Sequence, residues 1–228
     1  DISLGLSDRA LMDFSDVAEG RCPLVRAAGN HPHLPGLAPL TAPMTLSPAL
    51  TEEDRRNLDW AARCGVTDVL QPFVRGAEDL AVLRGALAER GLERVRVMAK
   101  IENQLGIEKL DEIIDASDVI CIARGDLGNS MPLWELPAAQ KGIAARCRTA
   151  GRSFFVVTQL LWSMEQRAVP TRAEVCDIYN GVLDGAAALM LTGETAAGQY
   201  PAQAMEYLAK TAQCALRDRE VWKGMENP

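Results

Sequence analysis

Apolar residues from position 50 onward follow two alternating patterns. Short apolar runs alternate with longer segments in which apolar residues recur three or four positions apart. The first pattern is typical of strands buried on both faces, and the second is typical of amphipathic helices. The predicted strands are residues 66–74, 95–102, 119–123, 154–158 and 187–191.

Capping signals mark the ends of the predicted helices. Thr51 precedes a run of acidic residues, as N-caps do, and Thr171 with Glu174 has the pattern of a capping box. Glycines at positions 65, 91 and 151 are expected to end helices. Alternating strands and helices imply a parallel sheet covered by helices, either closed into a barrel or open. Six helices are predicted. The first begins at Thr51, the next three cover 77–90, 107–116 and 137–150, the fifth runs from Thr171 to about Leu183, and the last begins at Pro201.

Five strand–helix units are too few for a closed barrel, which needs eight in roughly 250 residues. We therefore expect an α/β fold of the TIM-type (β/α) barrel class that is incomplete or irregular on its N-terminal side. Residues 47–228 form the barrel portion in this interpretation, and 1–46 form a short β-rich segment with a Pro-rich connector. Three explanations of the missing units stay open: truncation at the front, an irregular patch formed by 1–46, and completion by a second chain. Because an incomplete barrel exposes sheet edges, we expect a homo-oligomer.

Composition narrows the class of partner. The chain has 228 residues, a net charge of −7 and a pI near 5.0, so we expect no binding to nucleic acid. No apolar run approaches the ~20 residues that span a bilayer, and no signal segment opens the sequence. We therefore expect a cytoplasmic protein that acts on a small molecule away from membranes. The six cysteines follow no metal-ligand spacing, and we expect them to be buried reduced thiols.

Charged and polar residues follow several predicted strands at the point where each strand ends. Lys100 and Glu102 end the second strand, Arg124 and Asp126 follow the third, and Thr158 ends the fourth. In a parallel barrel the C-terminal strand ends carry the chemistry. Two carboxylates can share a Mg²⁺ ion, and a nearby lysine can stabilise negative charge or carry a proton. Other polar residues at strand ends are Gln71, Asn103, Gln159, Thr192 and Glu194.

Each of these features has a plainer alternative. Lys100 and a carboxylate could form an ion pair at the barrel rim without any ligand. Glycines 125 and 128 around Asp126 would let backbone N–H groups approach an anion, or would only make a tight turn. Thr158 could donate a proton or serve only as a satisfied strand-end residue.

Several long motifs resemble one known family. In order and spacing, residues 47–210 resemble the second half of the catalytic barrel of pyruvate kinases, and the HLPG turn at 33–36 resembles the end of the small β domain that the family inserts into its barrel. No counterpart of the family's regulatory C-terminal domain is recognised. The motifs that carry the resemblance are MAKIENQLGIEKLDEIIDASDVICIARGDLG, VVTQLLWSM, PTRAEVCDIYNGVLDG and MLTGETAAGQYP.

The resemblance implies a metal site and a reaction. Glu102 and Asp126 match the two ligands that hold Mg²⁺ or Mn²⁺ against the pyruvate enolate, and Lys100 matches the lysine beside the transferring phosphoryl group. The family moves phosphate from phosphoenolpyruvate to ADP with a divalent ion and usually K⁺. The implied function is therefore that of a pyruvate kinase-type enzyme acting on phosphoenolpyruvate or pyruvate through a metal-bound enolate.

The resemblance also implies substrate contacts. Ala123, Gly125 and Asp126 match the turn whose backbone binds the substrate carboxylate, and Arg124 within this turn is grouped with the substrate-binding residues. Thr158 matches the threonine near the enolate carbon that is implicated in its protonation, and is expected to be both catalytic and substrate-binding.

The chain departs from the family pattern in the part of the active site that binds the phosphate groups. The family's phosphate-contacting arginine and its Asn, Ser and Asp ligands to K⁺ have no counterpart. Whether this chain uses ADP and K⁺ therefore stays open. Pro72 stands where a serine is usual, and Val157 where an alanine is usual. An alternative function is a metal-dependent pyruvate carbon–carbon lyase, either an aldolase or a decarboxylase, which needs no nucleotide site. A third is a degenerate barrel kept as an interaction module.

Overall fold

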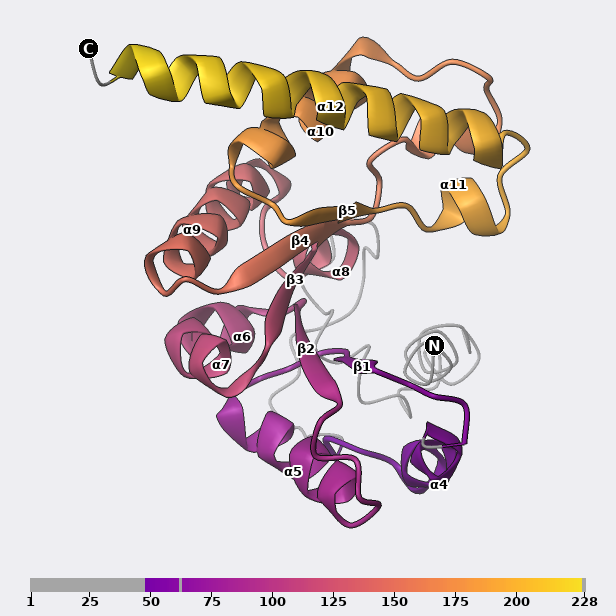
Figure 1. The fold of residues 1–228 in the computed structure, drawn as a ribbon, viewed down its shortest axis with the longest axis vertical. Coiled ribbons are helices and arrows are strands. Elements are labelled where there is room, and N and C mark those ends of the chain that lie inside the picture. Colours follow the sequence, from indigo (N-terminus) through magenta and orange to yellow (C-terminus); the bar gives the residue numbers. More distant parts are fainter. Residues whose placement is uncertain (1–47, 62, 227–228) are drawn as a thin grey trace, which may run out of the picture.

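The fold is known from a computed structural model that describes residues 48–61 and 63–226 (Figure 1). The predicted β-rich segment and connector at 1–46 lie outside these residues. No helix within the described ranges is long and apolar enough to cross a membrane.

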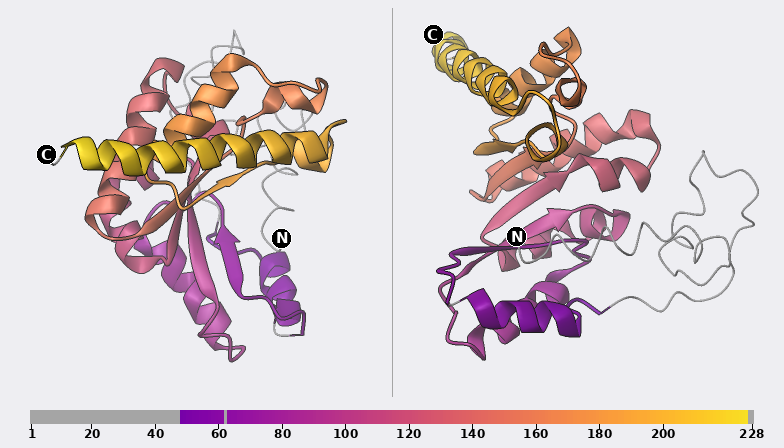
Figure 2. Two further views of the ribbon diagram at one scale, coloured as in Figure 1. Left: turned by 45° about the horizontal axis from the view of Figure 1, so that its top comes forward. Right: turned by 90° about the vertical axis from the view of Figure 1, so that its right-hand side faces the viewer.

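Five parallel strands form one sheet in chain order. Figures 1 and 2 show the strands fanned out between α4 and α5 at one end of the molecule and α12 at the other. Among the described residues the sheet is not closed, because its first and last strands each pair on one side only. This confirms the expected α/β fold and the incomplete barrel. The strands are β1 (Asp68–Gln71), β2 (Arg96–Ile101), β3 (Val119–Ala123), β4 (Ser153–Val157) and β5 (Ala188–Met190).

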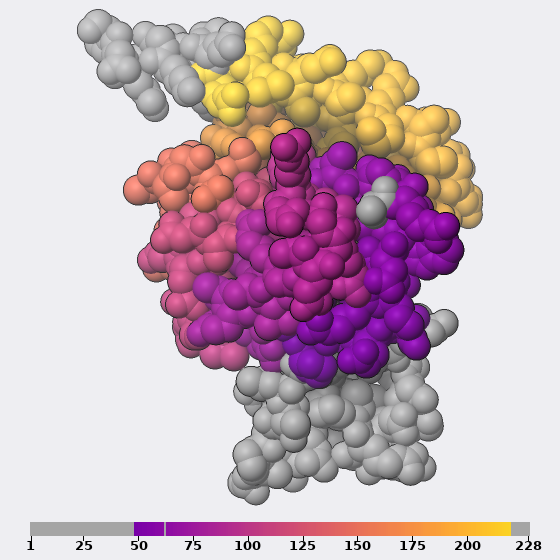
Figure 3. Space-filling view, turned by 60° about the horizontal axis from the view of Figure 1, so that its bottom comes forward, coloured from indigo at the N-terminus to yellow at the C-terminus, as the bar shows by residue number. Residues whose placement is uncertain are grey.

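Helices follow each strand, as the sequence pattern predicts. Figure 3 shows α4 and α5 packed side by side at the end of the molecule opposite α12. The longer helices are α4 (Glu52–Ala61), α5 (Ala77–Ala88), α7 (Leu110–Ala116), α9 (Leu136–Thr149), α10 (Arg172–Leu183) and α12 (Pro201–Glu226). Shorter elements, most of them at strand ends, are α6 (Gln104–Glu108), α8 (Arg124–Asn129), η1 (Leu133–Glu135), η2 (Trp162–Glu165) and α11 (Gly193–Ala196).

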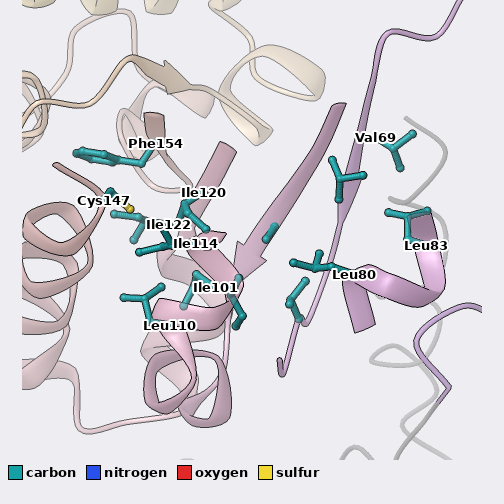
Figure 4. Packing of buried hydrophobic residues seen from close by; sticks show 14 of the residues in the cluster. Val69, Leu80, Leu83, Ile101, Leu110, Ile114, Ile120, Ile122, Cys147 and Phe154 are labelled. Atoms are coloured by element: carbon teal, nitrogen blue, oxygen red, sulfur yellow. The ribbon is translucent and has the colours of Figure 1, made fainter. Parts of the chain in front are cut away.

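The main core lies between the sheet and the helices that cover one of its faces (Figure 4). Alternate residues of each strand point into it, since side chains of a strand alternate between faces. In α5 the predicted stripe of Leu80, Leu83 and Leu87 is buried, which confirms the helical period of that segment. The strands contribute Val69, Val97, Ala99, Ile101, Ile120, Ile122, Phe154 and Val156 to this core.

The opposite face of the sheet carries a second apolar cluster. Cys121, Ala123, Phe155 and Val157 form its centre. Beside it a cavity of about 370 Å³ opens near β5 and is lined by Met98, Phe155, Met190, Leu191, Met205 and Leu208. The layer of side chains that would fill the interior of a closed barrel is therefore present, but the described residues cover it only in part.

Two predicted elements differ from the structure for local reasons. The strand expected at 66–74 is shorter, because Pro72 lacks an N–H donor and Phe73 has a left-handed backbone with φ of 51°. The helix expected at 107–116 is preceded by α6, which Asn103 starts by accepting a hydrogen bond from the Gly106 N–H. The capping box at Thr171 and Glu174 is confirmed, with both reciprocal hydrogen bonds present.

The expectation of buried cysteines is only partly correct. Cys121 and Cys147 are buried, and burial raises the pKa of both thiols. Cys64, Cys176 and Cys214 are exposed, although all five are free thiols. A position on a helix surface accepts cysteine as a small residue without burying it. The tendency of cysteine to be buried therefore does not predict exposure at such positions.

Leu83→Ala should lower the free energy of unfolding by about 2–5 kcal/mol, because it leaves a cavity in the main core. The neighbouring Val82 is 40% exposed on the same helix, so Val82→Ala should change that free energy by less than about 0.5 kcal/mol. Urea unfolding followed by circular dichroism measures both. Equal losses would contradict the assigned orientation of α5.

Candidate active site

The candidate site residues sit at the C-terminal ends of three adjacent strands. Lys100 is the penultimate residue of β2 and Glu102 follows its end, while Asp126 lies in the first turn of α8, directly after β3. Thr158 follows β4. Parallel pairing of Lys100 with Cys121, and of Ala123 with Val157, aligns these three strand ends along one edge of the sheet.

Glu102 is the most deeply buried charged residue of the group. Its side chain is 0% exposed, and its Oε1 lies 2.6 Å from Lys100 Nζ. Its Oε2 accepts a hydrogen bond of 2.7 Å from the backbone N–H of Phe73. Apart from the Lys100 ammonium, Oε1 has no hydrogen-bond partner among the described residues. The ion pair anticipated as the plainer alternative is thus present, and it leaves one buried oxygen with spare acceptor capacity.

The environment of Glu102 shifts its titration. Burial raises the pKa of the Glu102 carboxyl, against the opposing effects of the Lys100 ammonium and the Phe73 N–H. The carboxylate of Asp126 adds a smaller upward effect, which places its charge within electrostatic range of Glu102. Glu102 and Asp126 lie at the C-terminal ends of the paired strands β2 and β3.

The donor set around these carboxylates is small. No group of three or more His, Cys, Asp or Glu residues that could hold a metal occurs within 48–61 and 63–226. Two carboxylates suit Mg²⁺ or Mn²⁺, because these ions leave several coordination positions to water and substrate oxygens. Two carboxylates are too few for a site in which the protein supplies every ligand.

Thr158 adopts a backbone conformation that is rare for its residue type. Its φ is 74°, and the next residue, Gln159, has φ of 52°. The Thr158 Oγ1 accepts a hydrogen bond of 2.8 Å from the Gly125 N–H. Because that oxygen acts as the acceptor, this hydrogen bond does not use the hydroxyl proton. The arrangement links the loop after β4 to the start of α8.

Arg124 holds the same threonine from a second direction. Its Nη2 donates to the Thr158 carbonyl at 2.7 Å, and its Nη1 pairs with Asp177 Oδ2 at 2.6 Å. The Arg124 side chain is only 10% exposed. Its guanidinium is thus engaged by protein groups, and the Gly125 N–H is likewise used by Thr158. The carboxylate-binding role of Ala123, Arg124, Gly125 and Asp126 stays a prediction.

Three polar residues grouped with the site by their position in the sequence have other partners. Gln71 donates to the backbone carbonyls of Asp79 and Ala49. Asn103 caps α6 and donates to the Val74 carbonyl. Glu194 is buried and accepts from the N–H groups of Leu161 and Thr192. A strand-end position alone does not separate loop-anchoring side chains from those that face the site.

Sequence reasoning missed two residues that shape the site. Phe73 acts through its backbone N–H, and the conformation of a phenylalanine backbone leaves no sequence signal. Asp177 lies on α10, far from Arg124 in the chain. The only signal for Asp177 in the sequence is its place in the PTRAEVCD motif. It was missed because an acidic residue on a helix is usually interpreted as exposed to solvent.

Comparison with known proteins shows which family this chain resembles. The family model described as pyruvate kinase, barrel domain, matches residues 36–205. The pyruvate kinase of Schizosaccharomyces pombe is 44% identical over 168 residues, which cover 74% of this chain and 33% of that protein. Pyruvate kinase 1 of Trypanosoma brucei brucei is 40% identical over 183 residues, which cover 79% of this chain and 36% of that protein.

A bacterial relative gives the same result. The pyruvate kinase of Clostridium acetobutylicum is 42% identical over 166 residues, covering 73% of this chain and 35% of that protein. The chain thus spans about a third of the length of the relatives it matches. By the match to the family model and by these identities, the chain belongs to the pyruvate kinase family.

Proposed function

We propose that this chain carries the enolate side of a pyruvate kinase-type active site, acting on phosphoenolpyruvate or pyruvate with Mg²⁺ or Mn²⁺. The observation that carries the proposal is the buried Glu102 carboxylate. It has an oxygen with spare acceptor capacity, a lysine at 2.6 Å and the charge of Asp126 nearby. Membership of the family supports the assignment of these residues.

The residues fit a hard divalent cation. A fully buried carboxylate oxygen without enough partners is unfavourable, and a cation would relieve this. Glu102 and Asp126 would hold the ion. When bound, it supplies positive charge that stabilises negative charge on substrate oxygens as an enolate forms.

Lys100 and Thr158 supply the remaining chemistry in this proposal. The Lys100 side chain is 13% exposed, so its ammonium would reach a substrate while Glu102 holds it in place. It would stabilise the phosphoryl group as that group leaves the enol oxygen for the terminal phosphate of ADP. Thr158 would pass one proton towards the methylene carbon of the enolate, which yields pyruvate. The hydrogen bond from the Gly125 N–H uses the Thr158 hydroxyl as an acceptor and so does not consume its proton.

Phosphoryl transfer to ADP needs groups that this chain does not match. The family's phosphate-contacting arginine and K⁺ ligands lie, by resemblance, in barrel strands that precede the matched part. We therefore propose enolate formation and protonation as the chemistry that the described residues support, with ADP and K⁺ as further requirements of the full reaction. All the relatives reported above are named pyruvate kinases, so they lend no support to the carbon–carbon lyase alternative.

We propose that the protein self-associates. Within the described part of the chain, β1 and β5 each pair on one side only, so their other edges carry unpaired backbone groups. Large apolar side chains are also exposed after α8 and β4, with Trp134 at 82%, Leu133 at 68% and Trp162 at 63%. Apolar surface of this kind is typical of protein contacts. A cytoplasmic location stays a prediction from the sequence.

Glu102→Gln should weaken Mn²⁺ binding by at least about tenfold, because it removes one of two ligand charges. Asp126→Asn should act in the same way. Electron paramagnetic resonance of free Mn²⁺ measures binding, and exchange of the pyruvate methyl protons in D₂O measures enolate formation. The exposed Glu206→Gln on α12 is the control, with both properties unchanged. Full Mn²⁺ affinity in either site variant would contradict the metal assignment.

Asp177→Asn should slow proton exchange by about tenfold to a hundredfold, because a displaced Arg124 no longer fixes Thr158. Mn²⁺ affinity should stay as in the wild type, since neither residue contacts Glu102. The two measurements together separate positioning of the threonine from loss of the metal site. An unchanged exchange rate would show that the Arg124–Asp177 pair has no part in the chemistry.

A further inference from the structure

The loop after β1 contains an unusual backbone conformation beside the candidate metal site. Phe73 has φ of 51°, and it is one of three non-glycine residues with positive φ among the described residues, with Thr158 and Gln159. All three follow the C-terminal end of a strand. Non-glycine residues rarely adopt this conformation, and where they persist the surrounding structure imposes it, often at functional sites.

Phe73, in this left-handed conformation, donates its backbone N–H to Glu102. The hydrogen bond to Oε2 is 2.7 Å long and joins residues 29 positions apart. Hydrogen bonds to a charged oxygen are shorter and stronger than neutral ones. With Oε2 held in this way, the other oxygen is the one that lies against Lys100 at 2.6 Å. The Phe73 N–H therefore decides which oxygen of the carboxylate remains for a ligand.

Contacts on the C-terminal side of Phe73 hold it in this conformation. Val74 is fully buried, and its carbonyl accepts from Asn103 Nδ2 at 3.1 Å. The Arg75 N–H and guanidinium both bind the Asp79 carboxylate, at 2.6–3.0 Å. Glu102 and Asn103 thus each bond to one of two successive residues of the loop. The strained backbone is fixed by a set of contacts that does not depend on the phenylalanine ring.

We infer that Phe73 is a positioning residue for Glu102, acting through its backbone N–H and not through its ring. The inference rests on the proposed function, in which Glu102 holds a divalent cation. Carboxylates that bind metals are commonly oriented by a hydrogen bond from a second group, and loss of that group weakens metal binding. In this chain the orienting group is the N–H of a residue with left-handed φ.

Two isomeric substitutions separate backbone from side chain. Leucine and isoleucine have the same volume and both remove the ring, but the β-branched isoleucine is far less tolerant of positive φ. Phe73→Ile should lower the Mn²⁺ affinity of the full chain by about tenfold relative to Phe73→Leu. Phe73→Gly, which adopts positive φ freely, should bind Mn²⁺ like the wild type although it has no side chain at all.

Mn²⁺ alone is the probe, with free ion measured by electron paramagnetic resonance and the fold checked by thermal unfolding. Equal Mn²⁺ affinity in folded Phe73→Ile and Phe73→Leu would overturn the inference. So would loss of affinity in folded Phe73→Gly, because the ring would then be what matters; this variant decides the question if Phe73→Ile does not fold. A wild-type chain that binds no Mn²⁺, or a Glu102→Gln chain that binds it fully, would instead overturn the proposed function.

Discussion

A buried carboxylate governs the arrangement at the strand ends. Removing Glu102 from water is unfavourable unless each oxygen is compensated, and the structure compensates the two oxygens in different ways. One accepts the Phe73 N–H, and the other lies against the Lys100 ammonium with acceptor capacity to spare. The surrounding geometry follows from this asymmetry, because the loop after β1 must turn back to deliver its N–H and Lys100 must stay close to balance the charge.

Left-handed backbone at strand ends recurs in this molecule for a shared reason. Phe73 presents an N–H to one site residue, while Thr158 presents its carbonyl and hydroxyl oxygens to Arg124 and Gly125. Ion pairs hold both loops: Arg75 with Asp79 after β1, and Arg124 with Asp177 beyond β4. The cost of an unfavourable φ is thus offset by ion pairs that anchor the two loops.

The open sheet gives the two faces of the strands different environments. One face is fully covered by helices, while the other carries an apolar layer with a cavity beside β5. A closed barrel packs this inner layer from all sides. The matched relatives are about three times as long as the portion they share with this chain. The side chains of the proposed enolate site nevertheless come from the ends of three neighbouring strands, β2, β3 and β4, with one backbone N–H from the loop after β1.

The sequence by itself determined the order of strands and helices, the buried stripe of α5, the capping box at Thr171 and the convergence of Lys100, Glu102, Asp126 and Thr158 at one edge. These follow from periodicity, capping and parallel pairing, which are local or nearly so. Only the tertiary structure decided that Arg124 pairs with Asp177, that Gln71 and Glu194 anchor loops, and that the Phe73 N–H holds Glu102. Those outcomes depend on which groups meet across long chain separations, and on a φ angle that the identity of a phenylalanine does not encode.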